Sequence, residues 1–296
     1  MTPSSTIALA LAIALAAGPA SAQLPTPEIP LVVTADWLAP RRADPSVVVL
    51  HVAQGDDYEK GHVPGARKLA YSSIVTRRGT LGSELPDAAH LRDVFESHGV
   101  SDGTTVVVYA HEAPMATRVL FSLASIGHTK FALLDGGLRA WRAGKHATEK
   151  SAPQVTRGTL TERAAPEIVA TAEWITPRLD GPGLAFIDTR TTGEYNGTGN
   201  RSGMPSAGHL AGARQLEWEQ MFSDGMTLLK PRAELERMFG ERAAAGDTVV
   251  TYCWVGYRAS ATWFVAKYLG YDARMYDGSY QDWSQRGLPA KSGTAP

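Results

Sequence analysis

The sequence predicts an α/β fold made of two tandem domains, each with a mainly parallel sheet flanked by helices. Three observations support this prediction: one pattern of segments occurs twice, short β-branched runs alternate with helical patterns in each copy, and a polar segment separates the copies. The chain has 296 residues, of which 44% are hydrophobic and 20% charged. That composition is enough for two ordinary globular cores.

The charge of the chain argues against two classes of partner. Lys and Arg number 29 and Asp and Glu number 30, which gives a formal net charge of -1. Without a basic stripe, neither a nucleic acid nor a membrane surface is favoured as a partner, and we expect a small-molecule site. One cysteine and no Cys/His cluster predict neither a metal site nor another cofactor.

The N-terminal segment has the pattern of a secretory signal. An apolar run at 7–17, too short to span a bilayer, is followed by Gly-Pro at 18–19 and by the A-x-A pattern at 20–22. We therefore expect residues 1–22 to be a signal peptide cleaved after Ala22, and the mature protein to be secreted, to the periplasm in a Gram-negative cell. The alternative is a buried N-terminal helix.

The elements of each copy can be placed in order. Strands are expected at 47–50, 104–109 and 131–134 in the first copy, and at 184–187, 248–252 and 273–276 in the second. Helices are expected at 116–126 and 258–269. In parallel sheets of this kind ligands bind at the carboxyl ends of the strands, so the site is expected there.

The duplication itself is visible in paired segments with an offset of about 140 residues. The pairs are GHVPGAR at 61–67 and GHLAGAR at 208–214, LLDGGLRAW at 133–141 and RMYDGSYQDW at 274–283, VVVYAHEAPMATRVLF at 106–121 and VVTYCWVGYRASATWF at 249–264, and VVLHVAQGDDY at 48–58 and AFIDTRTTGEY at 185–195. We expect domains at 31–144 and 167–290, joined by a linker at 145–166.

Cys253 is the only cysteine, so it cannot form a disulfide within the chain. An inert core thiol, an intermolecular pairing site and a nucleophile are the remaining interpretations. Its position favours the nucleophile, because it lies in a turn at 253–258 between a strand and a helix. Gly256 allows the turn to adopt a positive φ, the backbone N–H groups can then converge on one anion, and Arg258 adds a cation for the thiolate or for an anionic substrate.

Three motifs resemble those of the tandem-domain rhodaneses, a family of sulfurtransferases. They are C-x-x-G-x-R at 253–258, D-x-R-x-x-x-E-Y at 188–195 followed by G-H-x-x-G-A at 208–213, and Y-D-G-S-Y-x-D-W at 276–283. The resemblance implies two rhodanese-like domains and transfer of a sulfane sulfur through a persulfide on Cys253. The donor would be thiosulfate or 3-mercaptopyruvate, and the acceptor cyanide, a thiol or an exported thiol protein.

The residues and the resemblance together predict roles. Cys253 attacks the donor as a thiolate, and the turn binds substrate and stabilises the persulfide anion. The substrate-binding residues of the turn are Trp254, Val255, Gly256, Tyr257 and Arg258. Asp188 and Arg190, with Glu194, are expected to form a salt-bridged network that braces the turn, rather than to act as direct catalysts.

The first copy lacks the reactive residues. Ala110, Ala113 and Met115 stand where the second copy has Cys253, Gly256 and Arg258, and Pro114 is expected inside the loop. His51 likewise replaces Asp188. We expect the first copy to be a non-catalytic domain that packs against the second and forms one wall of the cleft between them. The alternative is that His111 or Glu112 reaches across to substrate or binds something separately.

Two other functions stay open. A non-turnover sulfur carrier or binding module would carry the same motifs. A cysteine phosphatase is disfavoured, because its loop has C-x5-R spacing and this chain has C-x4-R. Trp254 and Val255 match neither the thiosulfate nor the mercaptopyruvate subtype of the family, and Glu194 stands where the family tends to place an arginine. Arg258 is therefore expected to be the main cation of the turn.

Overall fold

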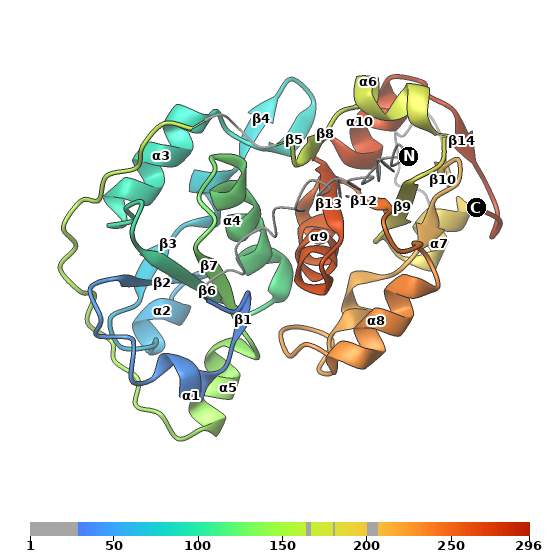
Figure 1. The fold of residues 1–296 in the computed structure, drawn as a ribbon. Helices are drawn as coiled ribbons and strands as arrows, with labels where there is room; N and C mark the ends of the chain where they lie inside the picture. Colours follow the sequence, from blue (N-terminus) through green and yellow to red (C-terminus); the bar gives the residue numbers. More distant parts are fainter. Residues whose placement is uncertain (1–28, 164–166, 180, 200–206) are drawn as a thin grey trace, which may run out of the picture.

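The computed structural model describes residues 29–163, 167–179, 181–199 and 207–296. These residues form two similar α/β domains that lie side by side (Figure 1). The expected signal peptide, residues 1–22, lies outside the described residues. Within the described ranges, no helix combines the length and the apolar character that crossing a membrane requires.

The first domain is built on a five-stranded parallel sheet with the order β1-β7-β6-β2-β3. Its strands are β1 (Val32–Val33), β2 (Val47–Val52), β3 (Arg67–Leu69), β6 (Thr105–Ala110) and β7 (Phe131–Leu134). The three expected strands are confirmed, with small differences at their ends. The central strand β6 is buried along its whole length, because helices cover both faces of the sheet.

The second sheet has the order β11-β9-β12-β13-β8 and is parallel throughout. Its strands are β8 (Val169–Ala170), β9 (Leu184–Asp188), β11 (Arg214–Gln215), β12 (Thr248–Tyr252) and β13 (Asp272–Tyr276). Each strand holds the same place as its counterpart in the first sheet. The duplication read from the sequence is therefore also a duplication of topology.

Helices and short elements connect the strands. The α-helices are α1 (Ala35–Leu38), α2 (Asp57–Lys60), α3 (Ala88–Ser97), α4 (Ala113–Ser125), α5 (Gly137–Ala143), α6 (Ala172–Ile175), α7 (Thr192–Asn196), α8 (Arg232–Gly240), α9 (Tyr257–Leu269) and α10 (Ser279–Gln285). The 3-10 helices are η1 (Tyr71–Ile74), η2 (Thr176–Arg178) and η3 (Trp218–Met221), and the two short strand pairs are β4 (Thr76–Arg78) with β5 (Leu81–Glu84) and β10 (His209–Leu210) with β14 (Ala290–Lys291). Pro114 lies in the first turn of α4 and not in a loop, since proline needs no N–H partner there.

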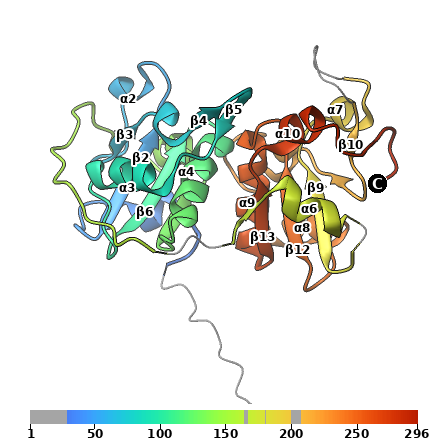
Figure 2. The same cartoon turned by 90° about the horizontal axis from the view of Figure 1, so that it is seen from above.

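The two domains share one apolar core. Alternate residues of β6 face α3 and α4 on one side of the sheet and α1 and α5 on the other. In the second domain α8 and α9 cover one face of the sheet, and α6 and α10 cover the other. Helices α4 and α9 occupy equivalent places and pack against each other between the domains (Figure 2). Every residue of α4 is buried for this reason, so its polar residues, Arg118 among them, face the protein interior and not solvent.

Polar contacts across the interface follow the internal symmetry. Thr117 of α4 and Ser260 of α9 are equivalent in the two copies, and their hydroxyl oxygens lie 2.8 Å apart. Asp277 accepts a hydrogen bond from the N–H of Leu85 at 2.6 Å. Its counterpart Asp135 accepts one from Leu229 at 2.9 Å. Each domain thus holds a segment of the other at the carboxyl end of its sheet.

The predicted linker follows the surface of the first domain as far as the structure describes it. Residues 145–163 contain no helix and no strand of more than one residue. The N–H of His62 donates to the carbonyl of Glu149 at 2.9 Å, and the N–H of Gly158 donates to that of Glu96 at 2.8 Å. These bonds satisfy buried backbone groups that would otherwise lack a partner.

A buried ion pair and a second acidic group lie at the same interface. Arg118 of the first domain is fully buried and reaches Asp277 at 2.6 Å. Burial, followed by the neighbouring charge of Asp277, raises the pKa of Glu84 from 4.5 to about 7, although Arg118 acts in the other direction. The folded protein therefore keeps a proton on Glu84 that the unfolded chain loses.

This shift predicts how stability depends on pH. The contribution of Glu84 to the free energy of unfolding should fall as pH rises from 4.5 to about 7, because the folded state then binds a proton that the unfolded chain has lost. We expect Glu84→Gln to raise Tm by about 2–8 °C at pH 8 and to leave it nearly unchanged at pH 4.5. Thermal unfolding at both pH values checks this, with Glu236→Gln on the exposed side of α8 as control. Equal shifts of Tm at the two pH values would contradict it.

Candidate active site

Cys253 lies where the sequence places it, directly after β12 at the carboxyl end of the second sheet. Helix α9 begins at Tyr257, so the turn is shorter than the expected range 253–258. The backbone N–H of Cys253 donates to the hydroxyl of Ser279 at 3.2 Å, and its carbonyl accepts from the N–H of Tyr280 at 3.0 Å. The residue is fully buried, with 0% of its surface exposed.

Gly256 adopts the left-handed conformation that the sequence predicts, with φ of 78°. Packing is a second reason for glycine, because a Cβ at this position would lie 2.9 Å from the carbonyl oxygen of Asp277 and 3.1 Å from Arg118. Among the described residues, none accepts a hydrogen bond from the backbone N–H groups of 255–258. These donors, at the start of a 13-residue helix, are available to an anion.

Arg258 is paired with a carboxylate. Two of its guanidinium nitrogens donate to Glu194 of α7, at 2.8 and 2.9 Å. Burial opposes ionisation of Glu194, but the hydrogen bond and charge of Arg258 outweigh it and lower the pKa of Glu194 to about 2. Burial likewise opposes the charge of Arg258, yet Glu194 and the nearby Cys253 thiolate raise its pKa. Arg258 is thus a cation beside the thiolate, as expected, but Glu194 offsets its charge.

Asp188 and Arg190 form a separate pair beneath the turn. Arg190 donates to the two carboxylate oxygens of Asp188 at 2.9 and 2.6 Å and to the carbonyl of Gly208 at 2.7 Å. Its guanidinium carbon lies 4.0 Å from the centre of the Tyr280 ring. Glu194 does not join this pair, because it is salt-bridged to Arg258 of the turn, so the residues expected in a network form two separate pairs.

The other residues of the turn contact both domains. Trp254 is buried in the second domain, with its ring centre 6.3 Å from that of Tyr280, and Val255 packs against the same cluster. The hydroxyl of Tyr257 donates to Glu112 of the first domain at 2.6 Å. Glu112 therefore does reach across the interface, but in this structure its partner is Tyr257.

Two further residues near the thiol were not predicted. Tyr71 lies in η1 of the first domain, edge-on to Tyr257 at 5.5 Å between ring centres. Burial raises the pKa of Tyr71, and the Cys253 thiolate adds to this against the opposing effects of Arg118 and Ser83. Nothing in the local sequence indicates this contact, because η1 and β12 meet only through the packing of the domains.

Ser279 could have been found from the sequence. It replaces a glycine of the first copy, Gly137, and both residues have φ of 53°. A non-glycine residue in this conformation is uncommon and is retained where its side chain has a task. The Ser279 hydroxyl donates to the carbonyl of Tyr276 at 2.8 Å and accepts from the N–H of Cys253, which fixes the start of the turn.

The site offers donors and charges but no metal ligands. Among residues 29–163, 167–179, 181–199 and 207–296, no group of three His, Cys, Asp or Glu side chains could hold a metal ion. The arrangement combines a thiol, the backbone N–H groups of 255–258, which have no acceptor among the described residues, and a neighbouring cation. Such a combination can stabilise a negative charge on sulfur.

Comparison with known proteins shows the family to which the chain belongs. A protein-family model described as "Rhodanese-like domain" matches residues 34–144 and 171–286. The chain is 32% identical over 259 residues to a thiosulfate sulfurtransferase of Pseudomonas aeruginosa, covering 86% of this chain and 94% of the relative. A thiosulfate sulfurtransferase of Corynebacterium glutamicum is also 32% identical, over 268 residues, with 85% of this chain and 87% of the relative covered. The chain belongs to the rhodanese family.

Solved structures share the fold. SseA from Escherichia coli, described as a 3-mercaptopyruvate sulfotransferase, has a TM-score of 0.74 at 22% identity, with 85% of this chain and 99% of that chain covered. An anaerobic ergothioneine biosynthesis enzyme from Chlorobium limicola has a TM-score of 0.76 at 22% identity, with 89% and 70% covered. At this level of identity the comparison establishes the architecture of two rhodanese domains.

Proposed function

We propose that the protein is a sulfurtransferase that carries a sulfane sulfur on Cys253 from a donor to a thiophilic acceptor. The donor is thiosulfate or 3-mercaptopyruvate, and the acceptor is cyanide or a thiol. The observation that carries the proposal is the position of Cys253 at the head of a turn in which the N–H groups of 255–258 have no acceptor among the described residues. The two relatives named thiosulfate sulfurtransferase, which align over both domains, support it.

The first half-reaction loads the thiol. The Cys253 thiolate attacks the outer sulfur of thiosulfate, a new S–S bond forms, and the S–S bond of thiosulfate breaks as sulfite leaves with the electron pair. The product is a persulfide anion on Cys253. The N–H groups of 255–258 stabilise its charge, because they converge at the N-terminus of α9 and need no reorganisation.

The second half-reaction removes the sulfane sulfur from Cys253. Cyanide attacks the outer sulfur of the persulfide, the S–S bond breaks, and thiocyanate leaves while the electron pair returns to the Cys253 thiolate. A thiol acceptor would take the sulfur in the same way. Asp188, Arg190 and Ser279 are positioning residues in this scheme, since their hydrogen bonds fix the backbone around the turn.

The organisation of the chain is part of the same proposal. Residues 31–144 would form the non-catalytic domain, 145–166 the linker and 167–290 the catalytic domain. The pattern at 7–22 supports removal of residues 1–22 and export of the mature protein, where thiols of exported proteins would be available as acceptors.

Intact-protein mass spectrometry tests the proposed function. Incubation with thiosulfate should add the mass of one sulfur atom, and subsequent cyanide should remove it. Steady-state thiocyanate formation in excess thiosulfate and cyanide then separates an enzyme from a sulfur carrier, because a carrier would load without sustained turnover. Loading of no sulfur would contradict the proposal.

A further inference from the structure

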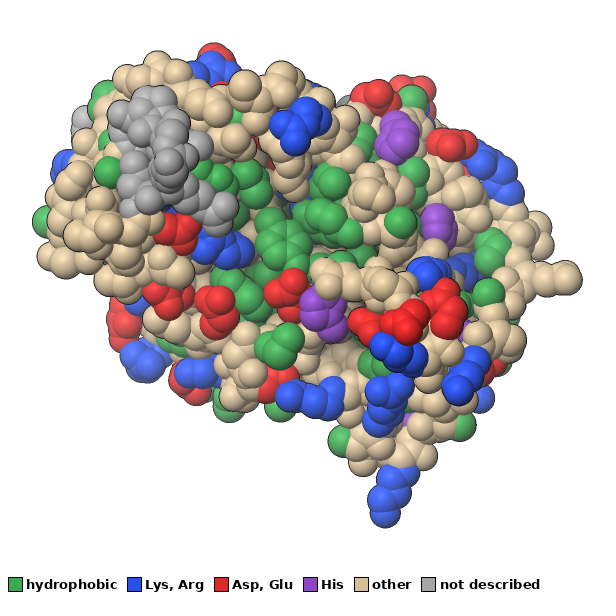
Figure 3. Space-filling view, turned by 180° about the vertical axis from the view of Figure 1, so that it is seen from behind, with side chains coloured by type: hydrophobic (Ala, Val, Ile, Leu, Met, Phe, Trp, Pro, Cys, Tyr) green, Lys and Arg blue, Asp and Glu red, His purple; other side chains and the backbone are tan. Residues whose placement is uncertain are grey.

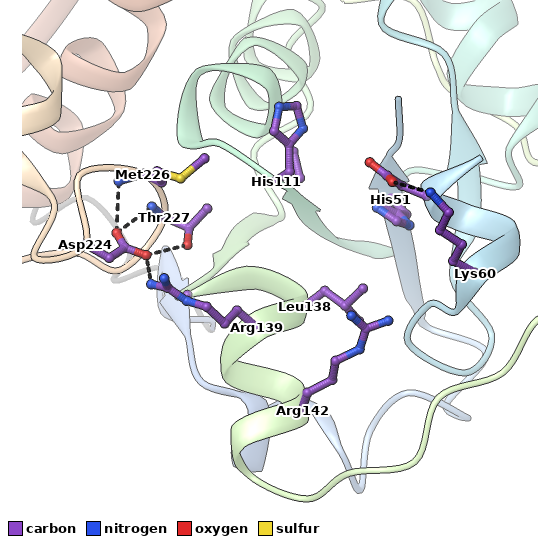
Figure 4. Close-up of a pocket in the computed structure, with 12 residues that line it drawn as sticks. His51, Lys60, His111, Leu138, Arg139, Arg142, Asp224, Met226 and Thr227 are labelled. Atoms are coloured by element: carbon purple, nitrogen blue, oxygen red, sulfur yellow. Dashed lines mark hydrogen bonds and ion pairs between the residues drawn. The ribbon is translucent and has the colours of Figure 1, made fainter. Parts of the chain in front are cut away.

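A cavity of about 340 Å³ opens at the first domain's counterpart of the active site (Figure 4). Ala110, which stands where the second domain has Cys253, lies in its wall. Most of the lining comes from the first domain, and the loop with Asp224, Met226 and Thr227 closes one side from the second. The volume is in the range of small-molecule sites.

The cavity exists because large side chains of the second domain have small counterparts in the first. Arg190, whose guanidinium lies over Tyr280 in the second domain, corresponds to Ala53. Tyr280 itself corresponds to Leu138. Loss of these side chains leaves unfilled space at the same point of the fold.

His51 lines this cavity without the ion-pair partner that its counterpart Asp188 has. It occupies the position of Asp188, but the arginine that would pair with it is absent at Ala53. The ring is only 4% exposed, stacks on Tyr109 at 4.4 Å, and its Nδ1 has no hydrogen-bond partner among the described residues. The ring forms no side-chain hydrogen bond to another described residue, so its edge in the cavity wall is available to a ligand that can hydrogen-bond to it.

The charges around the cavity are not balanced. Lys60 pairs with Asp56 at 2.6 Å and lies 3.9 Å from Asp57, which also lines the cavity, and Arg139 pairs with Asp224. Arg142 also lines the cavity, and in the described part of the chain it pairs with no carboxylate; its hydrogen bond to the carbonyl of Gly61 is long, at 3.4 Å. Figure 4 shows Arg139 near Asp224, whereas Arg142 lies on the side of His51 and Lys60.

The pKa of His51 reflects burial and the positive charges near the cavity. Burial, followed by the neighbouring His62 and His111 and then by Lys68 and Arg142, lowers it from 6.5 to about 4. The imidazole is therefore neutral at pH 7. An anion beside the ring would offset those charges and raise this pKa.

We propose that this cavity binds a small organic anion, with a carboxylate or similar oxyanion held by Arg142 and His51 and a short apolar body against Leu138 and Met226. The site does not depend on Cys253, so it goes beyond the proposed sulfur transfer. Because Met226 belongs to the second domain, a bound ligand would contact both domains and stabilise their packing.

Titration with benzoate, and with its neutral counterpart benzamide, tests this proposal. At pH 7 and low ionic strength, benzoate should shift the NMR signal of the His51 ring saturably, raise its pKa, and raise the Tm of the protein. Arg142→Gln should weaken benzoate binding about 10- to 100-fold, the effect of losing one charge-assisted contact. Arg237→Gln, an exposed arginine on α8, is the matched control and should bind normally.

The outcomes are separable from those of the sulfur-transfer assay. Cys253→Ser should bind benzoate as well as the original protein does, even though it transfers no sulfur. Four results would overturn the proposal: no saturable shift at His51, equal binding of benzamide, unchanged binding in Arg142→Gln, or shifts that map to the Cys253 turn instead.

Discussion

Cys253→Ser is expected to abolish sulfur transfer, with a loss of at least about 1000-fold in kcat/KM for thiosulfate. The hydroxyl of serine is not a thiophilic nucleophile, and it cannot hold a sulfane sulfur as a persulfide. The fold should be kept, because the replacement is nearly isosteric and the residue's backbone bonds to Ser279 and Tyr280 are unaffected. Thiocyanate formation and intact mass measure the first effect, and circular dichroism with Tm measures the second.

The matched comparison is in the other domain. Ala110→Cys introduces a thiol at the equivalent place, but Ala113 and Met115 there replace the glycine and arginine of the turn. We expect no sulfur loading of that cysteine in a Cys253→Ser background. Sulfur transfer by Cys253→Ser at the original rate, or loading of the new thiol as efficient as that of Cys253, would contradict the assignment.

Arg258→Ala is expected to lower kcat/KM for thiosulfate by roughly 10- to 1000-fold, the range for loss of a charge-assisted contact to the thiolate and the donor. Part of this loss comes from Glu194, since removal of Arg258 takes away two hydrogen bonds and a positive charge that lower the pKa of this buried carboxylate. Arg258→Lys should recover only part of the activity, because an ammonium group cannot form the two parallel hydrogen bonds.

The double variant separates the two contributions. Arg258→Ala with Glu194→Ala should be more active than Arg258→Ala alone, because the negative charge of Glu194 then no longer repels the anionic donor. Glu194→Gln alone should lower KM for thiosulfate, since the charge of Arg258 is no longer offset. Steady-state kinetics and the pH dependence of alkylation by iodoacetamide measure these effects. If Arg258→Ala left both unchanged, the backbone donors alone would meet the charge.

The surface around the domain interface determines how reagents can reach the thiol in such experiments. On the face opposite to that of Figure 1, hydrophobic side chains gather in the hollow between the domains, with acidic, basic and histidine side chains beside them (Figure 3). The thiol itself is fully buried in this structure. Donor and acceptor must therefore reach it through a local rearrangement, and alkylation rates report this opening together with the reactivity of the thiolate.

The strand, the turn and the helix around Cys253 could be predicted from the sequence because they are local. The β-branched run ending at Tyr252 and the apolar run from Ala259 define two elements, and Gly256 between them predicts the positive φ that the structure shows. The duplication extended this prediction to the whole fold, because two copies with the same order of segments can repeat the same order of strands.

What only the tertiary structure decided is which charged and polar groups meet. Glu194 pairs with Arg258 rather than joining Asp188 and Arg190, and Tyr71 and Glu112 of the first domain reach the turn of the second. The cavity beside His51 also became visible only in three dimensions. A sequence pattern fixes which face of an element is buried, whereas ion pairs and cavities depend on distances of a few ångströms between elements far apart in the chain.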